Sequence, residues 1–140
     1  AGIAACTVRA GEMHPAGGLS SLPGVEECPL VGVENTAEGM PAARMGWSHG
    51  FQLRALRVAP GAAAPRHARS EEEVLLGHSG MLRVGCDGDD IDLGPGDTFT
   101  VPRGAMRSFS NPGRVPAVVY VVRGGDRPAP AHWADASPAN

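Results

Sequence analysis

After Trp47 the chain alternates between short apolar runs and clusters of turn-forming residues. The strand-like runs are Gln52–Ala59, Glu73–Leu76, Met81–Cys86, Ile91–Leu93, Thr98–Val101, Arg107–Ser110 and Ala117–Arg123. Glycine, proline, asparagine and aspartate separate them, and these residues interrupt strands because they adopt turn conformations. Asp87-Gly88 is a hairpin signal, and no segment combines the length and the caps of a helix. The pattern predicts an all-β sandwich or barrel.

The two ends of the chain lack this alternation. Residues 1–46 are rich in glycine, proline and small side chains, and we expect an irregular arm with one short strand near Cys28–Val33. Structureless segments of this length are uncommon in compact domains, so the arm should pack on the barrel or on a second subunit. The barrel should span residues 47–123. Residues 124–140 contain three prolines, cannot continue a strand, and should form a loose or docked coil.

Length and charge narrow the class of protein. A chain of 140 residues suits one domain with one core. The net charge of −3 gives no polybasic surface, so we expect neither nucleic acid nor membrane as a partner. No apolar run approaches the roughly 18–20 residues that span a bilayer. Cys6, Cys28 and Cys86 are too few for a disulfide scaffold. We expect unpaired thiols in the cytoplasm, with a Cys6–Cys28 bridge as the alternative.

Two groups of residues at fixed spacing lie between Gly61 and Asn111. The first group is Gly61, His67, Arg69, Glu73 and Gly80. The second group is Gly96, Pro102, Gly104, Arg107 and Asn111. These spacings resemble the two motifs of the cupin superfamily, G-x5-H-x-H-x3-E-x6-G and G-x5-P-x-G-x2-H-x3-N. The resemblance implies a small single-domain cupin with a double-stranded β-helix, a jelly-roll-like barrel. Arg69 and Arg107 stand where the family has histidines.

Cupins use the histidines and the glutamate of these motifs to bind a divalent metal inside the barrel. Only His67 and Glu73 remain here, whereas a transition-metal site needs three or four donors. Arginine stays protonated, offers no lone pair and repels a cation. We therefore expect no tightly bound metal and no other cofactor. A divalent metal held with donors from elsewhere, such as His49 or His78, is the alternative, although both histidines are interpreted as surface residues.

The four side chains at the family positions should converge in the barrel. His67 and Arg69 are two residues apart and share a face of a strand, Glu73 enters on the next strand, and Arg107 comes from the second motif. Two interpretations of the arginines stay open. They pair with Glu73, because a buried carboxylate needs a partner, or they direct guanidinium donors at a ligand carboxylate, phosphate or enolate.

His67 and Glu73 also form a candidate acid–base pair, in which the glutamate orients the imidazole and raises its pKa. The alternative is that both residues are relics of a metal-binding ancestor. The neighbouring Glu71 and Glu72 have no motif position, and we expect them to be solvated.

The leading hypothesis is a single-domain cupin that binds a small anionic metabolite without the usual metal. An isomerase, cyclase or lyase activity is left open, because metal-free cupins that resemble sugar epimerases and polyketide cyclases use such groups. One alternative is a non-catalytic, degenerate cupin that serves as a dimerisation or sensor module. Another is a metal-dependent, dioxygenase-like cupin with unorthodox ligands. Fold alone does not decide among them. We also expect a homodimer in which residues 1–46 pack across the partner.

Overall fold

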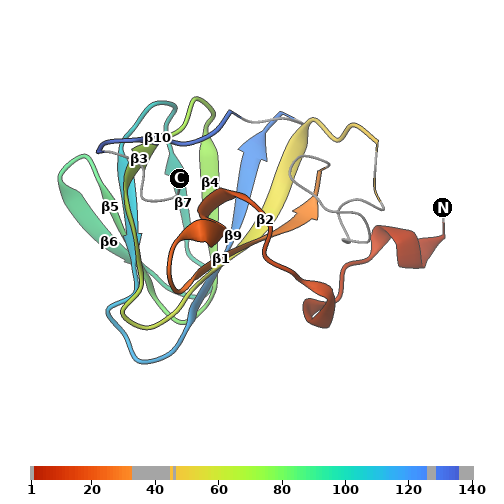
Figure 1. Ribbon diagram of the computed structural model, residues 1–140, viewed down its shortest axis with the longest axis horizontal. Coiled ribbons are helices and arrows are strands. Elements are labelled where there is room, and N and C mark those ends of the chain that lie inside the picture. Colours follow the sequence, from red (N-terminus) through yellow and green to blue (C-terminus); the bar gives the residue numbers. More distant parts are fainter. Residues whose placement is uncertain (1, 33–44, 46, 126–128, 136–140) are drawn as a thin grey trace.

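Two antiparallel sheets face each other in the computed structural model, which describes residues 2–32, 45, 47–125 and 129–135 (Figure 1). One sheet has the strand order β1-β2-β9-β4-β7, and the other has the order β10-β3-β8-β5-β6. The strands are β1 (Val25–Val31), β2 (Phe51–Val58), β3 (Ala63–Ala68), β4 (Glu73–Ser79), β5 (Leu82–Cys86), β6 (Asp89–Leu93), β7 (Thr98–Val101), β8 (Arg107–Ser110), β9 (Ala117–Gly124) and β10 (His132–Trp133). The predicted all-β class is confirmed.

Helical structure in the described residues is limited to three 3-10 turns. They are η1 (Ile3–Cys6), η2 (Ala10–Glu12) and η3 (Gly18–Ser21). None of them has the length or the apolar character that a membrane crossing would require.

The core lies between the inner faces of the two sheets. Alternate residues of each strand point inward, and their apolar side chains pack into one cluster. Its members include Leu56, Val58, Leu75, Val84, Val101, Phe109 and Val121. The polar site described below adjoins this cluster, because the ring of His67 packs against Phe109.

Most predicted strands occur at or near their predicted positions. β7 and β8 have the predicted bounds. The predicted hairpin joins β5 to β6, and Asp87 and Gly88 have φ angles of 54° and 84°. A two-residue turn of this type needs positive φ at both central positions. The coil expected after residue 124 needs one correction, because His132 and Trp133 pair with Ala68 and His67 of β3. Neither residue is a proline, so both can join a ladder.

The N-terminal segment contributes a strand to the barrel. The strand expected near Cys28–Val33 lies at Val25–Val31, where it forms the β1 edge of a sheet by pairing with β2. Val8 and Met13 pack over the outer surface of these two strands, against Cys28, Leu30 and Ala55. The described part of the arm therefore packs on its own barrel. Residues 33–44 and 46 of the arm lie outside the described residues.

Candidate functional site

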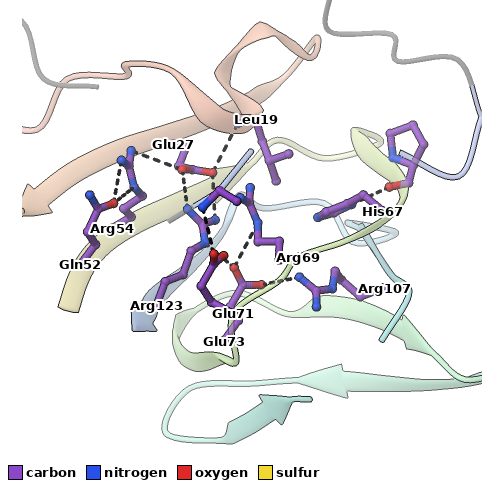
Figure 2. A network of polar contacts seen from close by, with 12 residues as sticks. Leu19, Glu27, Gln52, Arg54, His67, Arg69, Glu71, Glu73, Arg107 and Arg123 are labelled. Carbon is purple, nitrogen blue, oxygen red and sulfur yellow. Dashed lines mark hydrogen bonds and ion pairs between the residues drawn. The ribbon is translucent and has the colours of Figure 1, made fainter. Parts of the chain in front are cut away.

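The four side chains selected from the sequence meet inside the barrel. His67 lies on β3 and Arg69 directly after it, while Glu73 begins β4 and Arg107 begins β8. Their exposed fractions are 0% for His67 and Arg107, 1% for Glu73 and 4% for Arg69. His67 and Arg107 are direct partners in the β3–β8 ladder, so their side chains share a face of the sheet. Figure 2 shows Arg69 and Arg107 reaching toward Glu73 from two sides.

Glu73 is surrounded by three guanidinium groups. Arg107 Nη1 lies 3.5 Å from Oε1, and Arg69 Nε lies 3.5 Å from Oε2. The shortest contact comes from Arg123, whose Nε donates to Oε2 at 2.6 Å. Sequence reasoning missed Arg123, although alternation along β9 places it on the same face as the buried Val119 and Val121. The main partner of Glu73 therefore comes from outside both motifs.

A second buried carboxylate, Glu27 of β1, extends the cluster. Arg123 Nη1 donates to Glu27 Oε2 at 3.2 Å and Nη2 donates to Oε1 at 3.4 Å, so one guanidinium bridges both glutamates. Arg54 Nη1 lies 3.4 Å from Glu27 Oε2, and the Leu19 backbone N–H donates to Oε1 at 3.3 Å. The arginine network, as named below, consists of Glu27, Arg54, Arg69, Glu73, Arg107 and Arg123 (Figure 2).

Local backbone geometry makes room for Glu27. Gly18, at the start of η3, has a φ of +54°, and a Cβ atom there would collide with the Glu27 carboxylate. A glycine is needed at this position for both reasons. Sequence reasoning missed Glu27 as well, although alternation along β1 places it on the same face as the buried Val25.

The arginine network carries more positive than negative charge. Its four guanidinium groups face two carboxylates, which leaves an excess of two positive charges. Glu71 supplies one more carboxylate nearby. The expectation that Glu71 is solvated is wrong, because it is half-buried and its Oε2 accepts the Ala129 N–H at 2.9 Å. Glu72 is exposed, as expected.

The network fixes the ionisation of its carboxylates and arginines. Burial opposes the charge of Glu27, but Arg123, with help from Arg54, lowers the pKa of Glu27 to about 2. Burial likewise opposes the charge of Glu73, and Arg123 and Arg69 hold its pKa below the ordinary value. Burial lowers the pKa of Arg69 to about 10, which still leaves it charged at pH 7. Both glutamates are therefore anions and the arginines are cations at neutral pH.

His67 is held as a neutral imidazole. Its Nδ1 lies 2.8 Å from the Pro65 carbonyl oxygen, and a carbonyl only accepts, so Nδ1 carries the proton. The ring packs between Trp133 and Phe109, with centroid distances of 5.0 and 5.5 Å. Burial lowers the His67 pKa to about 4, and Arg69 adds to this effect. The expectation that Glu73 orients this ring is wrong, because the Pro65 carbonyl orients it. Glu73 does act to raise the His67 pKa, but burial outweighs this effect and the pKa falls.

The residues at the family's metal positions do not fit a transition metal. His67 and Glu73 are the only donors among the four, and both oxygens of Glu73 already face guanidinium groups. The described part of the chain contains no group of three or more histidine, cysteine, aspartate or glutamate side chains that could hold an ion. His49 instead contacts the Met45 carbonyl at 3.0 Å, and His78 is exposed.

All three cysteines are free thiols, so no Cys6–Cys28 bridge forms.

Comparison with known proteins identifies the fold. Residues 55–123 match the family model of the cupin domain. A mannose-1-phosphate guanylyltransferase of Escherichia coli K12 is 32% identical over 78 residues, which are 54% of this chain and 16% of that enzyme. The polyketide cyclase RemF from Streptomyces resistomycificus superposes with a TM-score of 0.72 at 17% identity, over 95% of this chain and 87% of RemF. A recombinant oxalate oxidase in complex with glycolate has a TM-score of 0.68 at 23% identity, over 95% of this chain and 65% of that one. The chain therefore contains a domain of the cupin superfamily.

Proposed function

We propose that this cupin barrel binds a small anionic metabolite at Arg107 and His67. The observation that carries the proposal is a set of three buried nitrogen atoms, Arg107 Nε, Arg107 Nη2 and His67 Nε2. None of them has a hydrogen-bond partner among the described residues. Leaving a buried polar group unsatisfied costs about 1–3 kcal/mol, and more for a charged group. A ligand that supplies partners for these atoms would remove that cost.

The charge of the site favours an anion as that ligand. Among the described residues, the network has four guanidinium groups and two carboxylates, and the site still carries an excess of one positive charge when the nearby Glu71 is counted. At an effective dielectric constant of 20, opposite charges about 4 Å apart attract by about 4 kcal/mol. An anion beside Arg107 would gain this attraction and also offset part of the excess charge.

The site is closed to solvent, so a ligand must displace a covering segment to enter. Trp133 of β10 covers the ring of His67 at a centroid distance of 5.0 Å. β10 pairs with β3 through only two residues among those described, His132 with Ala68 and Trp133 with His67, and backbone hydrogen bonds of Ala134 and Ala129 flank it. Short edge strands of this kind open at lower free energy than the rest of a fold. We therefore assign β10 as the segment that opens for ligand entry.

A catalytic role would use His67 to accept a proton, because it is the neutral base of the site. An isomerase, cyclase or lyase reaction would fit such a residue. The second candidate function is a non-catalytic dimerisation or sensor module. It is favoured by the complete pairing of Glu27 and Glu73 inside the network, which a purely structural role would also produce.

Ligand-induced stabilisation tests the proposal. Unfolding of the wild type is followed by calorimetry with small carboxylates and phosphates, and a ligand at 100 times its Kd should add about 2.7 kcal/mol. The Arg107→Met variant should lose this gain. The matched control is Arg83→Met, which removes a half-exposed arginine paired with Asp92 and should keep the gain. If no anion stabilises the wild type, the proposal fails and the non-catalytic module is favoured.

A further inference from the structure

We infer that the bound anion is a 2-hydroxy acid, a carboxylate with a hydroxyl group on the neighbouring carbon. The inference rests on the proposed function and adds the ligand class. It follows from the hydrogen-bonding pattern that Arg107 and His67 present together.

Arg107 presents one complete edge of its guanidinium group. Its Nη1 is directed at Glu73 Oε1, 3.5 Å away. Nε and Nη2 lie on the other edge of the planar group, and both are buried without a hydrogen-bond partner among the described residues. Two parallel N–H donors match the two oxygen atoms of a carboxylate. The free edge of Arg107 is therefore complementary to a ligand group with two acceptor oxygens.

His67 is complementary to a hydrogen-bond donor on the ligand. Because Nδ1 donates its proton to the Pro65 carbonyl, the neutral ring has its lone pair on Nε2. A second proton on Nε2 is disfavoured by burial and by the charges of Arg69 and Arg107. His67 Nε2 is thus an acceptor, and the ligand must offer it an O–H or N–H donor.

One small molecule can supply both the carboxylate for Arg107 and the hydrogen-bond donor for His67. His67 and Arg107 are directly opposite each other in the β3–β8 ladder, and the Cβ atoms of such residues are roughly 4.5–5.5 Å apart. A donor on the carbon next to a carboxylate satisfies both side chains from a short ligand. A protonated 2-amino group would be repelled by the positive excess of the network, whereas a hydroxyl group is neutral. A 2-oxo group would place an acceptor against the Nε2 acceptor. The hydroxyl group is the substituent that fits.

Calorimetric titration of the full chain with lactate, pyruvate, alanine and propionate tests this ranking. These compounds differ only at the carbon next to the carboxylate, and the same four groups on a phenyl-substituted skeleton cover a larger ligand. Lactate or its phenyl analogue should bind about tenfold tighter than the matching unsubstituted acid, which corresponds to about 1.4 kcal/mol. The oxo and amino acids should bind no better than the unsubstituted acid. Inorganic phosphate is included, because the arginine edge also suits phosphate.

The His67→Phe variant supplies the matched test of the acceptor. Phenylalanine suits the apolar surroundings of Trp133 and Phe109, so the variant should fold, and the tenfold ratio between the affinities of the hydroxy acid and of the matching unsubstituted acid should fall to about one. The control His78→Phe, at an exposed position, should keep the preference. Nitrogen-15 NMR of the His67 ring, which needs no variant, should show a protonated Nδ1 and an unprotonated Nε2.

The outcomes separate the two proposals. If neither the carboxylates nor phosphate bind the wild type, the proposed function fails, and the ligand class fails with it. If the carboxylates bind without preference for the hydroxyl group, or if phosphate binds tighter than both hydroxy acids, the ligand class is overturned and the proposed anion site stands. A protonated Nε2 in the NMR spectrum likewise overturns the ligand class alone.

Discussion

Replacing Arg123 and Arg107 separately by methionine distinguishes a structural arginine from a ligand-binding one. Arg123 is 5% exposed and bridges both buried carboxylates, with contacts of 2.6 Å to Glu73 and of 3.2 and 3.4 Å to Glu27. Arg123→Met leaves these carboxylates with longer contacts, of 3.4 Å from Arg54 and 3.5 Å from Arg69 and Arg107. Breaking a buried ion pair from one side costs about 3–5 kcal/mol. At about 4 °C per kcal/mol, the Tm should fall by roughly 12–20 °C.

Arg107→Met should cost much less, although Arg107 is completely buried. Among the described residues it contacts one carboxylate, Glu73, at 3.5 Å, and Glu73 keeps Arg123 and Arg69 in the variant. The substitution also removes two buried nitrogen atoms without hydrogen-bond partners and reduces the positive excess of the network. We expect a loss of free energy of unfolding below about 2 kcal/mol, within the ordinary range for single substitutions.

Urea unfolding in anion-poor buffer at pH 7, followed by the fluorescence of Trp47 and Trp133, measures both variants. Their m-values should match the wild type, so that differences in midpoint report differences in stability. The reasoning is refuted if Arg107→Met destabilises the protein as much as Arg123→Met does. Arg107 would then be a structural partner of Glu73, and the anion site would lose its main residue.

Three further predictions concern pH, metal and assembly. The pKa of His67 is about 4 in the folded state and 6.5 ordinarily, so the unfolded chain binds this proton first as the pH falls. The free energy of unfolding should therefore fall by about 3 kcal/mol between pH 6.5 and about 4, and pH-dependent calorimetry should show that His67→Phe removes this loss. Glu27 should add a second loss between pH 4.5 and about 2. Elemental analysis should find Fe, Mn, Ni, Zn and Cu well below one per chain, and a Tm that drops with chelator would contradict this. Light scattering at micromolar concentration should show a homodimer, and truncation of the arm should convert the dimer into monomers.

The barrel was predictable because its signals are local. Alternation and turn residues placed most strands, and the motif glycines mark places where the backbone demands glycine. Gly80, for example, has a φ of +66°, and a Cβ there would collide with the Pro116 carbonyl. The positive φ is a property of the turn itself, so the spacing of the motifs is enough to recognise such a glycine, whereas the contact with Pro116 joins distant parts of the chain.

The arginine network was only half predictable, because its contacts join distant parts of the chain. Glu27 and Arg123 are 96 residues apart. Alternation places each of them on an inward face, but sequence does not say which inward residues meet. The motif positions directed attention to Arg69 and Arg107, whereas Arg123 makes the shortest contact with Glu73. Strand order, which brings β1, β2, β9 and β4 into one sheet, decides the partners.

The tautomer of His67 depends on an irregularity in the pairing of β3 with β8. The β3–β8 register shifts between Ala64 and His67, and Pro65 lies within this irregularity. Proline has no N–H for the ladder and is tolerated at such a bulge. The bulge brings the Pro65 carbonyl to His67 Nδ1 at 2.8 Å. The carbonyl fixes the tautomer, with the acceptor on Nε2, whereas burial keeps the ring neutral.

Arg107 is the arginine that the pairing of the two buried glutamates does not require. A network that only filled the space of a lost metal ion would need one arginine for each carboxylate, and Arg123 with Arg54 or Arg69 already provides that. Arg107 has one carboxylate contact among the described residues, of 3.5 Å, and a whole edge free of hydrogen bonds to them. It also lies directly across the ladder from the unpartnered acceptor of His67. Burying an arginine in this state is unfavourable for the empty barrel. The same arrangement becomes favourable when an anion with a neighbouring hydroxyl group completes it, and this is why we place the ligand there.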